Sequence, residues 1–190
     1  MLTLTTLGKL LYWSWVLSEI AILVATCTRH GKGEIRDQGS LLLLWITIVA
    51  SINLGVAFGD AHGPTMFPGA ESIRYVGVVL LVLGLAIRWT AVLSLGGSFS
   101  ANVAVRAGQR LQTGGFYRLV QHPSYLGLLL VIVAIGLHTH NWAGFAIVLI
   151  PSMAALSYRM HVEEQALKEA FGETYERYRI RTKRLFPGVY

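Results

Sequence analysis

Two groups of polar side chains in the second half of the chain have types and a spacing that could do chemistry. The first group is Tyr117, His122, Pro123, Ser124 and Tyr125. The second group is Arg159, Glu163 and Glu164. Because Arg159 and Glu163 are four residues apart, a helix places them on one face. An arginine can hold a carboxylate through two parallel hydrogen bonds, and a glutamate can accept hydrogen bonds from an ammonium or from hydroxyl groups.

These two groups of residues can be interpreted either as a ligand-binding site or as ordinary structural contacts. If a helix begins at Pro123, its free backbone N–H groups can receive an anionic ligand group beside His122. The spacing of Arg159 and Glu163 also fits an ordinary salt bridge at the membrane surface, followed by a solvated amphipathic helix. Spacing alone does not separate a binding site from this surface arrangement.

The elements that position these residues are predicted to be membrane-spanning helices. The chain has 190 residues, of which 54% are hydrophobic and 14% are charged. A soluble domain carries about 25% charged residues, so this composition disfavours a water-soluble enzyme, a disordered chain and a disulfide scaffold. The sequence therefore predicts an all-α fold, a polytopic helical bundle in a membrane.

Five apolar segments predict about five transmembrane helices across a hydrocarbon core of about 30 Å. They cover residues 10–28, 41–58, 75–95, 119–137 and 142–158. Pro123 breaks the fourth segment near its start, and Pro151 is expected to bend the fifth because proline removes a backbone donor. Residues 138–141 are too few for more than a tight turn, so the last two segments are predicted to form a helical hairpin.

We interpret residues 1–190 as a single integral membrane domain. Residues 1–95 hold the three N-terminal spans, and residues 96–190 hold a long loop, the hairpin and an amphipathic helical tail. Lys and Arg gather on one side of the bundle, and only Lys9 and Arg74 fall on the other. This asymmetry predicts a multi-pass protein with its N-terminus outside and its C-terminus in the cytoplasm. Because these cations face membrane lipids, the net charge of +6 does not require nucleic acid as a partner.

Two charged side chains fall inside the predicted spans, Glu19 in the first and Arg88 in the third. An unpaired charge at this depth costs at least about 2.5 to 3.5 kcal/mol. Either the two side chains pair, or Arg88 extends to the cytoplasmic surface. The sequence leaves both arrangements open.

Cysteine and histidine usage predicts neither a disulfide nor a metal site. Cys27 is the single cysteine and is expected to be a small buried residue. The histidines at 122, 138, 140 and 161 are scattered and lack the spacing of metal ligands. No metal is therefore predicted.

The two polar groups together resemble the isoprenylcysteine carboxyl methyltransferase family, whose members are small multispan membrane enzymes that use S-adenosylmethionine. The resemblance rests on Gly115-x-Tyr117-x4-His122-Pro123-Ser124-Tyr125-x-Gly127, on Arg159-x3-Glu163-Glu164, and on Phe171-Gly172-Glu173-x-Tyr175-x2-Tyr178 with a final Pro187. It covers roughly residues 98–187, about half of the chain. The two-part pattern across a helical hairpin is specific.

The resemblance implies that Arg159 is the catalytic residue, at the position where the family has an arginine that holds the substrate or serves catalysis. It also implies S-adenosylmethionine as the cofactor, in contact with Leu111, Tyr117, His122, Pro123, Ser124, Tyr125, Glu163 and Glu164. Gln121 stands where the family usually has arginine. The loop 101–110 does not align clearly, so no cofactor contact is assigned there.

The implied activity is methyl transfer to a lipophilic or lipidated substrate from the bilayer, most simply the carboxylate of a prenylcysteine. One alternative is N-methylation of a phospholipid headgroup amine, with Glu163 or Glu164 taking the proton. Another is an NADPH-dependent sterol-type reductase, whose C-terminal motif the ending 186–190 resembles. A non-enzymatic membrane scaffold would not explain the two polar groups. The identity of the methyl acceptor and the oligomeric state are not predicted.

Overall fold

A computed structural model describes residues 4–26, 34–35, 39–65, 71–96, 104–105 and 111–186, and every structural statement below concerns these residues. Cys27, the loop 106–110 and the final Pro187 lie outside them. The expectations for these positions therefore stay predictions.

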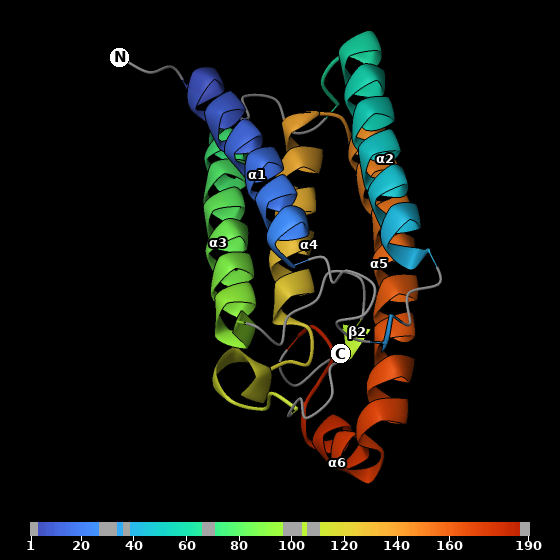
Figure 1. Ribbon diagram of the computed structural model, residues 1–190. Helices are drawn as coiled ribbons and strands as arrows, with labels where there is room; N and C mark the ends of the chain where they lie inside the picture. The colour runs from blue at the N-terminus through green and yellow to red at the C-terminus, as the bar shows by residue number, and fades with distance from the viewer. Residues whose placement is uncertain are drawn as a thin grey trace.

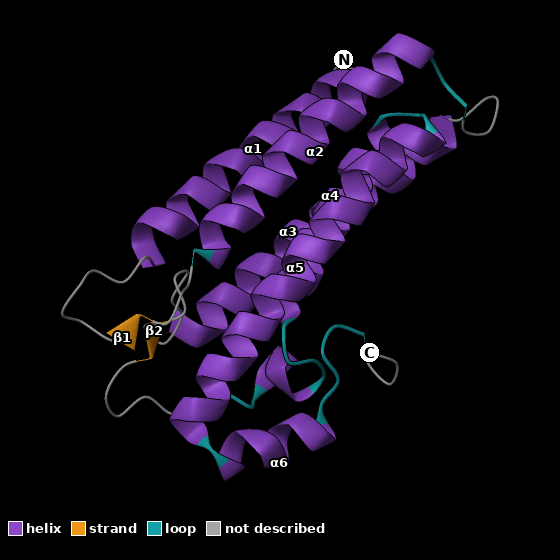
Figure 2. Cartoon of the chain, turned by 90° about the vertical axis from the view of Figure 1, so that its right-hand side faces the viewer, coloured by secondary structure: helices purple, strands orange, loops and turns teal. Residues whose placement is uncertain are grey.

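The described chain is all-helical apart from one short strand pair (Figure 1). The α-helices are α1 (Leu4–Thr26), α2 (Ser40–His62), α3 (Glu71–Leu95), α4 (Pro123–His138), α5 (Trp142–Phe171) and α6 (Glu173–Arg181). A 3-10 turn, η2 (Gly115–Arg118), precedes α4, and β1 (Glu34–Ile35) pairs antiparallel with β2 (Ala104–Val105). Helices α1 to α5 run side by side, and α6 lies across one end of the bundle (Figure 2).

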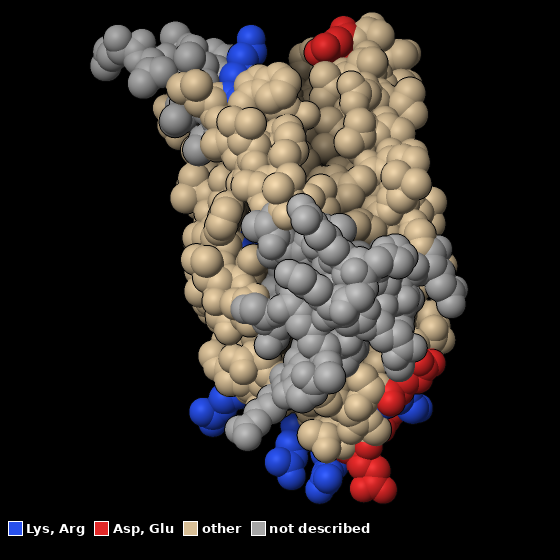
Figure 3. Space-filling model, viewed as in Figure 1, with Lys and Arg blue, Asp and Glu red and all other residues tan. Residues whose placement is uncertain are grey.

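Three of these helices are long and apolar enough to cross a membrane: α2, residues 72–95 of α3, and α5. Shorter apolar stretches lie in α1 (Tyr12–Val24) and form all of α4. The expected membrane-type helical bundle is thus confirmed, whereas a count of five transmembrane helices stays a prediction. On the visible face in Figure 3, charged side chains gather at the two ends of the described surface.

Helix α4 begins at Pro123, four residues later than the apolar segment 119–137 predicts. Proline is favoured in the first turn because it has no N–H to leave unpaired there. The preceding residues pair with the end of the chain instead: the N–H of Gln121 donates to the carbonyl of Lys183 at 2.7 Å, and that of His122 to Arg184 at 3.0 Å. Residues 119–122 therefore belong to a loop that holds the C-terminal segment.

The predicted hairpin of α4 and α5 is confirmed. Asn141 caps α5, because its side-chain oxygen accepts hydrogen bonds from the N–H groups of Ala143 and Gly144 at 3.0 and 3.1 Å. Helix α5 is continuous through Pro151 and continues beyond Tyr158 to Phe171. This extension carries Arg159, Glu163 and Glu164 away from the apolar part of the helix.

The core is formed by two tightly packed helix pairs, α3 with α4 and α2 with α5. In the first pair a Cβ atom on Gly84 would lie 2.7 Å from the carbonyl oxygen of Gly127, and one on Gly127 would lie 2.6 Å from that of Gly84. Gly55 and Gly144 make a similar contact between α2 and α5. Such small residues let membrane helices pack backbone against backbone.

We expect Gly84→Ala to destabilise the bundle by about 1–3 kcal/mol, because its methyl group would overlap the backbone of α4. Gly77→Ala on the same helix is the matched control, since its Cβ would lie 3.5 Å from the nearest atom, an ordinary contact. Thermal unfolding in detergent should show a lower Tm for Gly84→Ala than for Gly77→Ala. Equal Tm values would contradict the close contact.

Candidate functional site

A cavity of about 50 Å³ lies between the helices at the α6 half of the bundle. It is bordered by the second half of α1, the start of α2, the end of α3, the turn η2, the start of α4 and the middle of α5. Six of the nine predicted site residues line it: Tyr117, His122, Ser124, Tyr125, Arg159 and Glu163. The tertiary structure thus brings the two polar groups of the sequence to one place.

The other three predicted residues do not line this cavity. Leu111 is half-buried in the loop before η2, and Pro123 is buried in the first turn of α4. Glu164 is buried beside His122 and faces the C-terminal segment. Their expected contacts with a cofactor stay predictions.

Arg159 is the central charged group of the site and is only 1% exposed. Its Nη1 donates to the Ser40 hydroxyl at 2.5 Å, and its Nε donates to the Tyr125 hydroxyl at 3.3 Å. These bonds join the middle of α5 to the starts of α2 and α4. Arg159 is therefore buried inside the bundle, and its placement in a salt bridge at the surface is wrong, whereas its role in a site stays a prediction. Ser40 was missed, because nothing in its local sequence connects it to a residue so distant along the chain.

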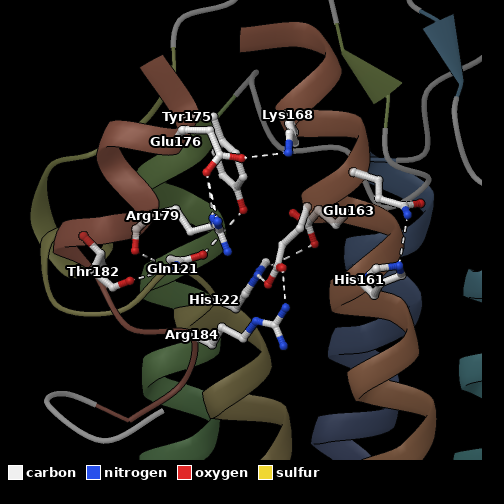
Figure 4. Close-up of polar contacts among 12 residues, drawn as sticks. Gln121, His122, His161, Glu163, Lys168, Tyr175, Glu176, Arg179, Thr182 and Arg184 are labelled. Carbon is white, nitrogen blue, oxygen red and sulfur yellow. Dashed lines mark hydrogen bonds and ion pairs between the residues drawn. The ribbon is translucent and has the colours of Figure 1, made fainter. Parts of the chain in front are cut away.

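His122 lies between the two glutamates that follow Arg159 on α5 (Figure 4). Its Nε2 is 3.2 Å from Oε1 of Glu164, and its Nδ1 is 3.8 Å from Oε2 of Glu163. The other oxygen of Glu164 accepts a hydrogen bond from Arg184 at 2.6 Å. Glu164 thus holds the imidazole and ties it to the C-terminal segment, while the carboxylate of Glu163 borders the cavity.

The C-terminal segment fixes the loop that carries the first polar group (Figure 4). The side-chain amide of Gln121 donates to the carbonyl of Thr182 and accepts a hydrogen bond from the Tyr175 hydroxyl at 3.4 Å. The Tyr178 hydroxyl donates to the carbonyl of Tyr117 at 2.6 Å. Gln121, the position where the family usually has arginine, also lines the cavity, although the sequence analysis did not assign it to the site.

Burial keeps the tyrosines of this region protonated. It raises the pKa of Tyr117 well above its ordinary value, and the negative charge of Glu163 raises it further. Burial and the charges of Glu164 and Glu163 raise the pKa of Tyr175 in the same way, and burial alone raises that of Tyr178. These hydroxyl groups therefore act as neutral hydrogen-bond donors.

The two charges inside the predicted spans pair with each other beside the cavity, and both line it. The Nε of Arg88 donates to one oxygen of Glu19, and Nη2 donates to the other at 2.5 Å. Nη1 donates to the hydroxyl of Ser124 at 2.8 Å and to its carbonyl at 3.2 Å. The prediction that Glu19 and Arg88 pair is therefore confirmed, and the alternative that Arg88 extends to the cytoplasmic surface is wrong. The sequence indicated this pair because each of the two charged residues lies within an apolar segment.

Comparison with known proteins connects this geometry to a family. The family model described as the isoprenylcysteine carboxyl methyltransferase (ICMT) family matches residues 77–169. A probable protein-S-isoprenylcysteine O-methyltransferase of Oryza sativa subsp. indica is 32% identical over 154 residues, which is 78% of this chain and 79% of the relative. The chain belongs to the isoprenylcysteine carboxyl methyltransferase family. Protein-S-isoprenylcysteine O-methyltransferase A of Arabidopsis thaliana is 29% identical over 170 residues, which is 87% of this chain and 85% of the relative.

Membership of the ICMT family makes the chain a membrane methyltransferase. The matched residues include α4, most of α5 and therefore both polar groups. The comparisons support the methyltransferase interpretation and give no support to the sterol-type reductase or to the phospholipid headgroup N-methyltransferase. The resemblance noted in the sequence is thus confirmed.

We expect Glu19→Gln to lower stability by about 3–5 kcal/mol, because it leaves the Arg88 guanidinium buried without a counter-charge. The double variant Glu19→Gln/Arg88→Met removes both charges and should recover much of this loss. Thermal unfolding of the single and double variants in detergent measures the coupling. If the double variant loses as much stability as Glu19→Gln and Arg88→Met lose together, the pair contributes no coupling energy.

Proposed function

We propose that this protein transfers the methyl group of S-adenosylmethionine to the carboxylate of a prenylcysteine, with Arg159 as the catalytic residue. The observation that carries the proposal is the burial of Arg159 in a cavity bordered by Glu163, Tyr117 and Tyr125. A buried guanidinium suits an anionic acceptor, because a charge-assisted hydrogen bond is strongest where water is excluded. The names of the rice and Arabidopsis relatives support the same substrate class.

The side chains of the cavity fit the chemical groups of S-adenosylmethionine. The carboxylate of Glu163 can accept hydrogen bonds from an ammonium or from ribose hydroxyl groups. The rings of Tyr117 and Tyr125 can lie against a cation or an adenine ring. Because ligand pockets usually measure about 300–1,000 Å³, the cavity of about 50 Å³ must widen when such a molecule binds.

The reaction requires alignment and the exclusion of water more than a strong base. S-adenosylmethionine supplies a methyl group on a sulfonium, and the acceptor is already a carboxylate, so no proton has to be removed from it. Arg159 would fix the carboxylate so that one oxygen points at the methyl carbon. The buried surroundings of Arg159 would strip water from that oxygen before the transfer. His122 and Glu163 would hold the donor side of the cavity.

We also propose five transmembrane helices, with the N-terminus outside and the C-terminus in the cytoplasm. The asymmetry of Lys and Arg supports this orientation. In this orientation α6 and the candidate site would lie toward the cytoplasm, where a water-soluble cofactor is available. A lipidated substrate would reach the same site sideways from the bilayer.

Arg159→Ala should mainly lower turnover, by about 100-fold, because the acceptor loses its orientation, while the Kd for S-adenosylmethionine changes little. The assay is transfer of labelled methyl from S-adenosylmethionine to N-acetyl-S-farnesylcysteine by protein purified in detergent. Arg177→Ala on the exposed surface of α6 is the matched control and should keep full activity. Normal turnover of Arg159→Ala would remove this residue from the mechanism.

Glu163→Ala should mainly weaken cofactor binding, raising the Kd for S-adenosylmethionine by about tenfold. Titration calorimetry on the purified protein measures this Kd. Glu173→Ala, which removes an exposed carboxylate in the first turn of α6, is the control and should leave the Kd unchanged. Saturable binding of NADPH, or no binding of S-adenosylmethionine by the unchanged protein, would contradict the proposed function.

A further inference from the structure

Two buried indole N–H groups near the candidate site have no hydrogen-bond partner. They belong to Trp15 of α1 and Trp45 of α2, whose ring centroids are 6.4 Å apart. Among the described residues, no other buried side-chain nitrogen or oxygen lacks a partner. Burying an N–H group without a partner is costly, and most buried polar groups in proteins are hydrogen-bonded. An exception at the wall of a ligand cavity indicates a bond that a ligand completes.

Trp45 is the one of these two residues that borders the site cavity, together with Tyr125, Arg159 and Glu163. Trp15 borders neither this cavity nor the larger, mainly apolar one of about 500 Å³ that Tyr12 lines, although its ring centroid is 5.7 Å from that of Tyr12. Because the site cavity must widen when a ligand binds, a ring that no hydrogen bond fixes can turn its N–H toward that ligand. Trp45 is thus the indole that a ligand in the site can reach.

Trp45 lies on the same helix as a residue that holds Arg159. Ser40, at the start of α2, accepts a hydrogen bond from Arg159 at 2.5 Å. The five residues from Ser40 to Trp45 rise about 7.5 Å along the helix, and long helical side chains lean back toward the N-terminus. A group bound to Arg159 is therefore close to the indole of Trp45. The predicted cofactor contacts, by contrast, all come from residues 111–164, outside α1 and α2.

The methyl acceptor of the proposed reaction offers one good partner for this N–H group. A prenylcysteine at the end of a peptide carries a carboxylate, a thioether and the amide bond to the preceding residue. The carboxylate is assigned to Arg159, a thioether sulfur is only a weak hydrogen-bond acceptor, and an isoprenoid chain has no acceptor atom. The amide carbonyl remains, separated from the carboxylate only by the backbone N and Cα atoms and the carbonyl carbon.

We propose that the indole N–H of Trp45 donates a hydrogen bond to the amide carbonyl of the prenylcysteine. Trp45 is then a specificity-determining residue that favours a peptide-like acceptor over an analogue without the amide. This inference rests on the proposed function, because it assumes that the acceptor carboxylate lies at Arg159. The gain is selective, since an acceptor without the carbonyl leaves the N–H of Trp45 unpaired, as it is in the empty site.

Two matched substitutions and two acceptors test this bond. N-acetyl-S-farnesylcysteine contains the amide, whereas farnesylthiopropionate has the same carboxylate and thioether but no amide. Trp45→Phe should raise the ratio of the KM for the first acceptor to the KM for the second by about tenfold. Trp15→Phe, which removes the neighbouring indole N–H, should leave this ratio unchanged. An unchanged ratio in Trp45→Phe, or an equal change in both variants, would overturn the proposal.

A second variant removes the N–H without changing the size of the ring. Replacing Trp45 by benzothienylalanine puts a sulfur atom in the place of the indole N–H and keeps the two fused rings. It should raise the same KM ratio by about as much as Trp45→Phe does. A normal ratio with benzothienylalanine would show that packing of the ring, and not its N–H, acts on the acceptor, and would overturn the proposal.

Equilibrium binding separates this inference from the proposed function. Titration calorimetry in detergent gives the Kd of each acceptor without a methyl donor, and a parallel titration gives the Kd of S-adenosylmethionine. We expect Trp45→Phe to raise only the Kd of N-acetyl-S-farnesylcysteine, by about tenfold. A higher Kd for S-adenosylmethionine instead would assign the N–H to the cofactor and overturn the inference. The expected selective loss in a protein that methylates neither acceptor would contradict the proposed function alone.

Discussion

A buried guanidinium inside an apolar bundle must have its N–H groups hydrogen-bonded, and two buried arginines do this by joining helices that are distant in sequence. Arg88 of α3 bonds to Glu19 of α1 and to Ser124 in the first turn of α4. Arg159 of α5 bonds to Ser40 in the first turn of α2 and to the tyrosine next to Ser124. All five long helices therefore meet around the start of α4. Because removing Glu19 would leave the charge of Arg88 buried without a counter-charge, the position of α1 against α3 is strongly specified.

The C-terminal segment completes the junction from the end of the bundle. It pairs with the backbone of Gln121 and His122, and Arg184 holds the carboxylate that contacts the imidazole of His122. The buried tyrosines of η2 and α6 stay protonated and serve as donors within this arrangement. The loop before α4 is thus fixed between the arginine junction and the tail. This double attachment gives a short loop the rigidity that positioning of a ligand requires.

The two cavities have complementary character. The smaller one is bordered by charged and hydroxyl groups, and the larger one is mainly apolar, with the Trp15–Trp45 pair between them. The groups that the proposed methyl transfer uses thus all line the smaller cavity.

By itself the sequence determined the class of fold, the helical hairpin and the residues of the two polar groups, because hydropathy, proline positions and spacing are local properties. It also indicated that Glu19 and Arg88 need partners, since a charge in an apolar run is costly wherever it lies. Only the tertiary structure decided that these two pair, that Arg159 contacts Ser40, that Gln121 lines the cavity, and that Arg184 contacts Glu164. Each of these contacts joins segments far apart in the chain, so they depend on helix packing that no local pattern encodes.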